Sequence, residues 1–133
     1  MKLKDIRINN DLIARFAGWE FVNDDVDAFP NGYYLYKDKI NGNAIATIDE
    51  LDYRSEWGAL MFVVEMIEKL GHLTIIGNTY CNIMYGVTET ERQKLYTMLN
   101  TETKAAGLHK VKITAVYLAV VEFITWYNKQ KNG

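Results

Sequence analysis

The residues best suited to bind a ligand stand together in one stretch, Leu51–Trp57, which includes Tyr53 and Arg54. An apolar helical stripe follows, so this stretch should lead into a helix N-terminus, where unpaired backbone N–H groups and the helix dipole favour an anion. Arg54 is suited to hold a phosphate or carboxylate through two hydrogen bonds, and Tyr53 and Trp57 are suited to stack on a base. The alternative interpretation is a helix cap followed by a core tryptophan and a solvated arginine.

Two glutamates, Glu65 and Glu122, interrupt the long apolar stripes of the sequence. If both side chains face one cleft, they form a carboxylate pair of the kind that carries out general acid–base catalysis. The simpler interpretation is one exposed glutamate on each helix, with Glu65 paired to Lys69 four residues later.

The two histidines, His72 and His109, are far apart in the sequence and follow no metal-ligand spacing. His72 comes directly after Gly71 at a predicted helix end, where an imidazolium would interact favourably with the helix dipole. We favour this structural role over a catalytic one.

The remaining candidates for metal binding or nucleophilic chemistry are one cysteine and one acidic loop. Cys81 is the only cysteine of the 133 residues and lies in a strand-like run, so we expect a buried thiol. Asp24, Asp25 and Asp27 partly match a calcium loop but lack the glycine and the glutamate that such a loop requires. We interpret them as a solvated acidic loop and expect neither a metal nor a cofactor.

Composition narrows the class of protein. The 133 residues are 49% hydrophobic and 24% charged, which is typical of one globular domain, residues 1–133. A net charge of −2 argues against binding of duplex nucleic acid, which needs a basic field. No apolar run approaches the ~18 residues of a membrane span, no segment is typical of a secretory signal, and the glycines form no phosphate-loop motif. We therefore expect a cytoplasmic protein.

The elements that must position these side chains follow from hydrophobic periodicity. Apolar residues recur at helical spacing over Trp57–Leu70 and Ile113–Tyr127, which predicts two long amphipathic helices. A short helix is predicted over Asp11–Ala17, with Asn9 or Asn10 as its cap. For the Trp57–Leu70 helix we expect Asp52 or Ser55 as the cap and Gly71 as the end.

Alternating segments broken by Asn-Gly and Gly-Asn predict two hairpins, Gly32–Ile48 and Leu73–Tyr85. Residues Val87–Lys110 read as a helical insertion, with a helix near Glu89–Leu99 followed by a polar loop, Asn100–His109. The predicted fold class is α+β: one antiparallel sheet of hairpins packed against the two long helices and the short N-terminal helix, as a layered sandwich.

Three blocks of the sequence resemble the phage ABA sandwich family of uncharacterised phage and prophage proteins. They are Leu12–Trp19, Tyr53–Trp57 running into Val63–Glu65, and Ala115–Asn128. Two departures are Arg54, which stands between Tyr53 and Ser55, and the Val87–Lys110 insertion. The resemblance implies a layered α/β sandwich and a phage setting, and it transfers no catalytic residues.

A phage setting favours a non-enzymatic accessory protein in the host cytoplasm that sequesters a small anionic nucleotide signal of host immunity. Alternatives are a protein that binds and inhibits a host protein and, third, a nucleotide-processing enzyme. We expect Arg54 with Lys110 or Lys112 to contact phosphate, and Tyr53, Trp57 or Tyr36 to stack on a base. Because 13% of the residues are aromatic, we also expect a homo-oligomer that uses Tyr33–Tyr36 or Glu89–Leu99.

Overall fold

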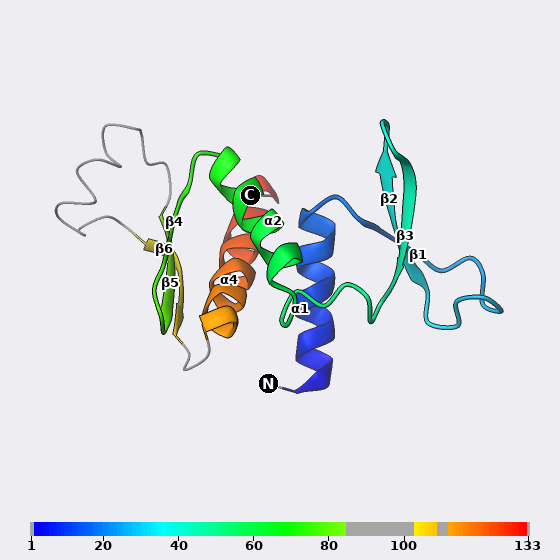
Figure 1. Cartoon of the computed structure of the whole chain (residues 1–133), viewed down its shortest axis with the longest axis horizontal. Helices are drawn as coiled ribbons and strands as arrows, with labels where there is room; N and C mark the ends of the chain where they lie inside the picture. The colour runs from blue at the N-terminus through cyan, green and yellow to red at the C-terminus, as the bar shows by residue number, and fades with distance from the viewer. Residues whose placement is uncertain (1, 85–102, 109–111, 133) are drawn as a thin grey trace.

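Three helices form a central layer with one antiparallel sheet on either side (Figure 1). This computed structural model describes residues 2–84, 103–108 and 112–132, and only the backbone is described for 103–108. The helices are α1 (Leu3–Phe16), α2 (Trp57–Lys69) and α4 (Lys112–Asn132). The α+β class and its layered arrangement are therefore confirmed.

The N-terminal helix is twice as long as predicted, since α1 spans 14 residues and begins at Leu3. Asn10 lies inside this helix rather than at its cap. Its side-chain oxygen accepts a hydrogen bond from the Tyr117 hydroxyl of α4 at 3.1 Å, and the carbonyl of Ile6 accepts from the same hydroxyl at 3.3 Å. Contact with α4 thus stabilises the first half of this helix, in which Asp5, Asn9 and Asn10 have low helix propensity.

The predicted cap of α2 is wrong, although the predicted helix is confirmed. Its N-cap is Glu56, whose side chain makes no capping hydrogen bond. The Ser55 hydroxyl instead donates to the Asp52 carboxylate, so the two expected caps bond to each other. At the other end Gly71 adopts a φ of +96°, which ends the helix as expected.

The two predicted hairpins are confirmed, but they belong to two separate sheets rather than one. The first sheet has the order β1 (Glu20–Val22), β2 (Tyr33–Asp38) and β3 (Gly42–Thr47). Tyr34 of β2 stands opposite Ala46 of β3 in the register. The helical layer lies between the two hairpins, so they do not pair with each other (Figure 1). Each hairpin instead forms a three-stranded sheet with one further strand.

The second sheet has the order β4 (Leu73–Ile76), β5 (Tyr80–Met84) and β6 (Thr103–Leu108). Strand β6 falls inside the segment that we expected to be a polar loop. Its Ala and Gly residues have low strand propensity, so pairing with β5 and packing against α4 determine its conformation. The predicted helix near Glu89–Leu99 lies outside the described residues.

The core fills the helical layer and the inner face of the second sheet. Its fully buried members include Leu60 and Ile67 of α2 and Val116, Val120 and Phe123 of α4, as the helical periodicity predicts. The first sheet joins this core through one buried residue in particular, Tyr34, whose hydroxyl donates to the Asp11 carboxylate of α1 at 2.6 Å. Within the described residues, no helix has both the length and the apolar character to cross a membrane.

Candidate functional site

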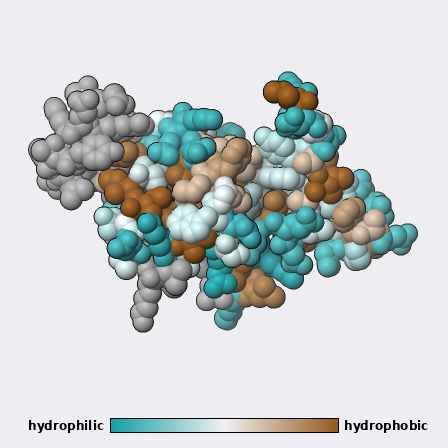
Figure 2. Space-filling view, in the orientation of Figure 1, coloured by the Kyte–Doolittle hydropathy of each residue, from teal (hydrophilic) through white to brown (hydrophobic). Residues whose placement is uncertain are grey.

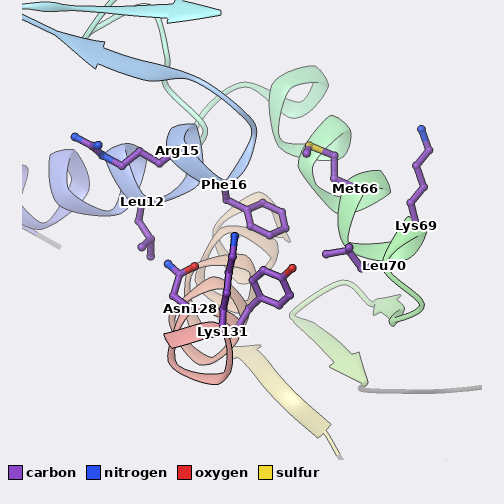
Figure 3. Close-up of a pocket in the computed structure, with 9 residues that line it drawn as sticks. Leu12, Arg15, Phe16, Met66, Lys69, Leu70, Asn128 and Lys131 are labelled. Carbon is purple, nitrogen blue, oxygen red and sulfur yellow. The ribbon is translucent and has the colours of Figure 1, made fainter. Parts of the chain in front are cut away.

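A cavity lies where the C-terminal ends of α1 and α2 face each other across α4 (Figure 3). We name it the helical cavity, and its volume is about 490 Å³. This volume lies within the ~300–1,000 Å³ range of small-molecule sites. Its lining residues come from three helices and from the residue after α2: Leu12, Arg15, Phe16, Met66, Lys69, Leu70, Tyr127, Asn128 and Lys131.

Aromatic rings form one wall of the helical cavity. The ring of Phe16 meets the ring of Tyr127 edge to face, with centroids 5.7 Å apart. Tyr127 stacks on Phe123 at 6.0 Å with an interplanar angle of 19°, so the buried core holds its ring in place. The wall therefore offers a rigid apolar surface to a ligand with a flat face.

Of the residues that the structure describes, three cations, Arg15, Lys69 and Lys131, line the helical cavity, and no carboxylate does. Each lies in the last turn of its helix, where the helix dipole contributes about half a unit of negative charge. Asp11 accepts a hydrogen bond from Arg15 Nε at 2.9 Å and raises the pKa of this guanidinium, leaving its outer nitrogens for other partners. Even with these opposing charges, the lining keeps a modest positive balance.

The three cations are not equally placed. In Figure 3 the side chain of Lys131 runs from α4 towards Phe16, whereas the charged ends of Arg15 and Lys69 point outwards on opposite sides. Leu12 and Leu70 enter from α1 and from the end of α2. An anion bound in this cavity would therefore meet the ammonium group of Lys131 first.

A second cavity, of about 360 Å³, lies between the first sheet and α2, and we name it the aromatic cavity. Trp19 and Tyr36 form one corner, with ring centroids 5.3 Å apart and planes inclined at 49°. Gly18 makes this corner possible, because a Cβ there would lie 3.2 Å from the Tyr36 ring and its φ is +102°. The full lining is Trp19, Tyr36, Asp38, Leu51, Tyr53, Ala59 and Phe62.

A third cavity, of about 300 Å³, contains Arg54 and lies between α1 and the loop after β3. Arg7 and Arg54 line it together with Asp49 and Asp52, so its charges are balanced. Balanced charge makes it a poorer site for an anion than the helical cavity.

The structure brings together only some of the residues that the sequence suggested as a binding site. Tyr36 and Tyr53 line the aromatic cavity, whereas Arg54 lines the third cavity. Trp57 is 39% exposed at the start of α2 and lines neither of these cavities. Lys112 is exposed at the start of α4, and Lys110 lies outside the described residues.

The start of α2 is itself unfavourable for a bound anion. Glu56 is the N-cap and Asp52 lies one turn before it, so two carboxylates already occupy the region in which the dipole favours negative charge. Tyr53 is buried, at 3% exposure, and burial raises the pKa of its hydroxyl to about 12. Its ring therefore serves mainly as a wall of the core.

The two glutamates considered as an acid–base pair lie on different helices. Glu65 of α2 lines a cavity of about 350 Å³ with Glu68 and Thr74, and Glu122 of α4 is not among the residues of that cavity. Both glutamates are exposed. The exposed glutamate on each helix agrees with the simpler interpretation, but the expected ion pair of Glu65 with Lys69 is not among the ion pairs of the described residues.

His72 differs from its expected role as a helix-end cation. It is 4% exposed and packs edge to face on Phe123, with ring centroids 4.8 Å apart. Burial lowers its pKa below 6.5, so the neutral imidazole is the favoured form. Cys81 agrees with expectation, because it is fully buried and burial raises the pKa of its thiol to about 12.

Sequence reasoning missed the helical cavity because its lining comes from three separate helix ends. The predicted helix ended at Tyr127, whereas α4 continues to Asn132 and places Asn128 and Lys131 on the cavity. The available signal was a basic residue in the last turn of each of these three helices. That pattern alone is also typical of ordinary helix ends.

Comparison with known proteins identifies no relative. No protein-family model matches the chain, and no characterised protein or solved structure matches it significantly. The chemistry of its cavities must therefore carry the functional argument.

Proposed function

We propose that this protein binds a small anionic ligand with a flat apolar group, of the nucleotide class, in the helical cavity and releases it unchanged. One observation carries the proposal: among the described residues, three cations and no carboxylate line a cavity whose wall is built of aromatic rings. A nucleotide presents both features, because its phosphates seek cations and its base has a π-face.

Each part of the lining has a role in this proposal. Lys131 would contact a phosphate oxygen, while Arg15 and Lys69, whose charged ends point outwards, would add positive potential at the rim. The Tyr127 and Phe16 rings would contact the face or edge of the base. The Asn128 amide can both donate and accept, so it would hydrogen-bond to polar atoms at the base edge.

Sequestration is the biological role that we propose for this binding. The resemblance to the phage ABA sandwich family supports a phage-encoded accessory protein, and binding without conversion would remove a nucleotide signal of host immunity. Within the described part of the chain, the lining of the helical cavity holds no aspartate, glutamate or histidine that could act as a general base on a bound ligand.

The first experiment is a thermal-shift screen of the full chain against mononucleotides, cyclic dinucleotides and cyclic ADP-ribose isomers. A ligand that binds only the folded protein raises the melting temperature in a concentration-dependent way. We expect a rise for at least one nucleotide and a smaller rise at high salt, since charge carries part of the affinity. No rise for any of them would contradict the proposal.

The fate of the ligand separates binding from catalysis. Protein incubated with the active nucleotide is denatured, and the released small molecule is identified by mass spectrometry. Recovery of the intact nucleotide supports sequestration, whereas recovery of a product would show an enzyme. If Arg54→Ala abolished binding and Lys131→Ala did not, the ligand would belong in the third cavity and our assignment of the site would be wrong.

A second function, binding of a host protein, is favoured by a different observation. Strand β3 is the edge of the first sheet, and its apolar Ile45 is 56% exposed. The turn before it carries Ile40, which is 91% exposed, and Figure 2 shows hydrophobic surface at this hairpin tip. An edge strand with exposed apolar side chains can pair with a strand of a partner protein. A purified complex that Ile45→Lys disrupts, with no response to nucleotides, would favour this function.

A further inference from the structure

We infer that the aromatic cavity is a second binding site, selective for an alkylated ammonium cation. The residues described in its lining combine four aromatic side chains with one carboxylate, that of Asp38, and include no lysine or arginine. This site lies on different residues from the helical cavity, and its proposed ligand has the opposite charge. Whether this site binds its ligand is therefore independent of whether the helical cavity binds a nucleotide.

The ring faces supply the first attraction. Trp19 and Tyr36 meet at 49°, so their π-faces form a corner rather than a flat stack. Tyr53 adds a buried wall from the loop, and Phe62, 51% exposed on α2, lies at the rim. A cation over several ring faces is attracted by the negative potential of each, which is how aromatic cages hold quaternary ammonium groups.

The carboxylate of Asp38 supplies the second attraction. Its Oδ1 accepts hydrogen bonds from the backbone N–H groups of Ile40 at 2.9 Å and Asn41 at 3.3 Å. These bonds lower the pKa of Asp38, so the group is charged at neutral pH. The Asn41 side-chain amide donates to Oδ2 at 3.1 Å, which holds the second oxygen.

The same hydrogen bonds select the type of cation. Three of the roughly four lone-pair sites of the Asp38 carboxylate already accept N–H bonds, so the group acts on a ligand mainly through its charge. A fully alkylated, quaternary ammonium has no N–H group, needs no acceptor and gains from apolar contact, whereas a primary ammonium loses strong hydration on entry. The volume of about 360 Å³ accommodates such a group.

Selectivity for charge is tested by a pair of ligands of nearly equal shape. Choline and its neutral isostere 3,3-dimethylbutanol are titrated into the full-length ¹⁵N-labelled protein, and the indole N–H resonances of the three tryptophans are followed. The Trp19 resonance is assigned with Trp19→Phe. We expect choline to shift this resonance saturably and the isostere to bind at least about threefold more weakly. Equal binding of the two would overturn the inference.

Two variants test the named residues. Asp38→Asn keeps an oxygen for the loop N–H groups but removes the charge, and Phe62→Leu removes an exposed ring, so we expect both variants to fold. Each should weaken choline binding about three- to thirty-fold, whereas Asp27→Asn in an exposed loop is the matched control and should not. Unchanged affinity in both folded variants would overturn the site.

The source of the ammonium group is tested separately with peptides that carry trimethyllysine or lysine. Tighter binding of the trimethyllysine peptide than of choline would identify a protein side chain as the ligand. Tighter binding of choline would identify a free small molecule. Preference for the unmodified lysine peptide would contradict selectivity for an alkylated ammonium.

Discussion

At the scale of single residues, burial changes the chemistry that a side chain can carry out. His72 and Cys81 are the clearest cases. Histidine and cysteine are residue types that often take part in chemistry, but both of these side chains are buried in the core. The sequence predicted the buried thiol from a strand-like run, but it placed His72 at a solvated helix end. The difference arises from α4, whose Phe123 covers the imidazole and is distant in sequence.

We predict that His72 makes the fold less stable in mild acid. Burial lowers the folded-state pKa of His72 below its unfolded value of 6.5, so the unfolded chain binds the proton more tightly. Stability from this group is full above pH 6.5 and is lost as the pH falls through 6.5 towards the folded pKa.

The measurement is urea denaturation at pH values of about 7.5 and 5.5, for the wild type and for His72→Leu. The wild type should lose more free energy of unfolding between these values than the variant. An identical loss in both proteins would show that His72 does not titrate as we infer.

At the scale of elements, periodicity predicted α2, α4 and both hairpins because each of these signals is local. The start of α1 and the strand β6 escaped prediction because contacts with α4 and β5 decide them, and such contacts have no local signal. The division into two sheets escaped for a related reason. An amphipathic stripe shows that a helix face is buried but does not show which layer covers it.

A charge at the centre of α4 should unfold the protein. Val120 is fully buried, so Val120→Asp places an unpaired carboxylate in the core and should cost more than about 4 kcal/mol. Thr125→Asp on the exposed face of the same helix is the control and should retain a cooperative transition. An undiminished thermal transition in Val120→Asp would show that this face of α4 is not buried.

Two glycines at the ends of α2 should respond oppositely to the same change. A Cβ at Gly58 or at Gly71 would meet no atom within 4 Å, so only the backbone distinguishes them. Gly58 lies within the helix, where alanine is favoured by up to about 1 kcal/mol, whereas Gly71 has a φ of +96° that alanine resists. Gly58→Ala should raise the melting temperature and Gly71→Ala should lower it. A rise in both would contradict the role of Gly71 as the helix end.

At the scale of the whole molecule, the helical layer brings three helix ends together and creates a cavity that no single segment contains. The sequence pointed to Tyr36 and Tyr53 as aromatic site residues, and these do share a cavity. The sequence did not predict that Phe16, Tyr127 and Lys131 line one cavity. Hydrophobic periodicity predicts neither the angles at which helices pack nor the residues at which they end. The proposed ligand class thus follows from the sequence, whereas its proposed location follows from the structure.

Self-association remains a prediction at this scale. Of the two segments we expected at a subunit contact, Tyr33–Tyr36 is largely used within the chain, since Tyr33 packs on Phe29 and Tyr34 bonds to Asp11. Glu89–Leu99 lies outside the described residues. We still predict a homodimer or larger assembly, to be measured by light scattering. A monomer at micromolar concentration would count against it.

The central claim is that a nucleotide-class anion binds beside Lys131. The most direct measurement is calorimetric titration of the best nucleotide from the screen into wild type, Lys131→Ala and Lys129→Ala. Both variants remove one exposed lysine from the last turn of α4, but only Lys131 lines the helical cavity. We predict at least about a tenfold loss of affinity in Lys131→Ala and little change in Lys129→Ala, as expected for one charge-assisted hydrogen bond. Equal affinities in the two variants would contradict the account.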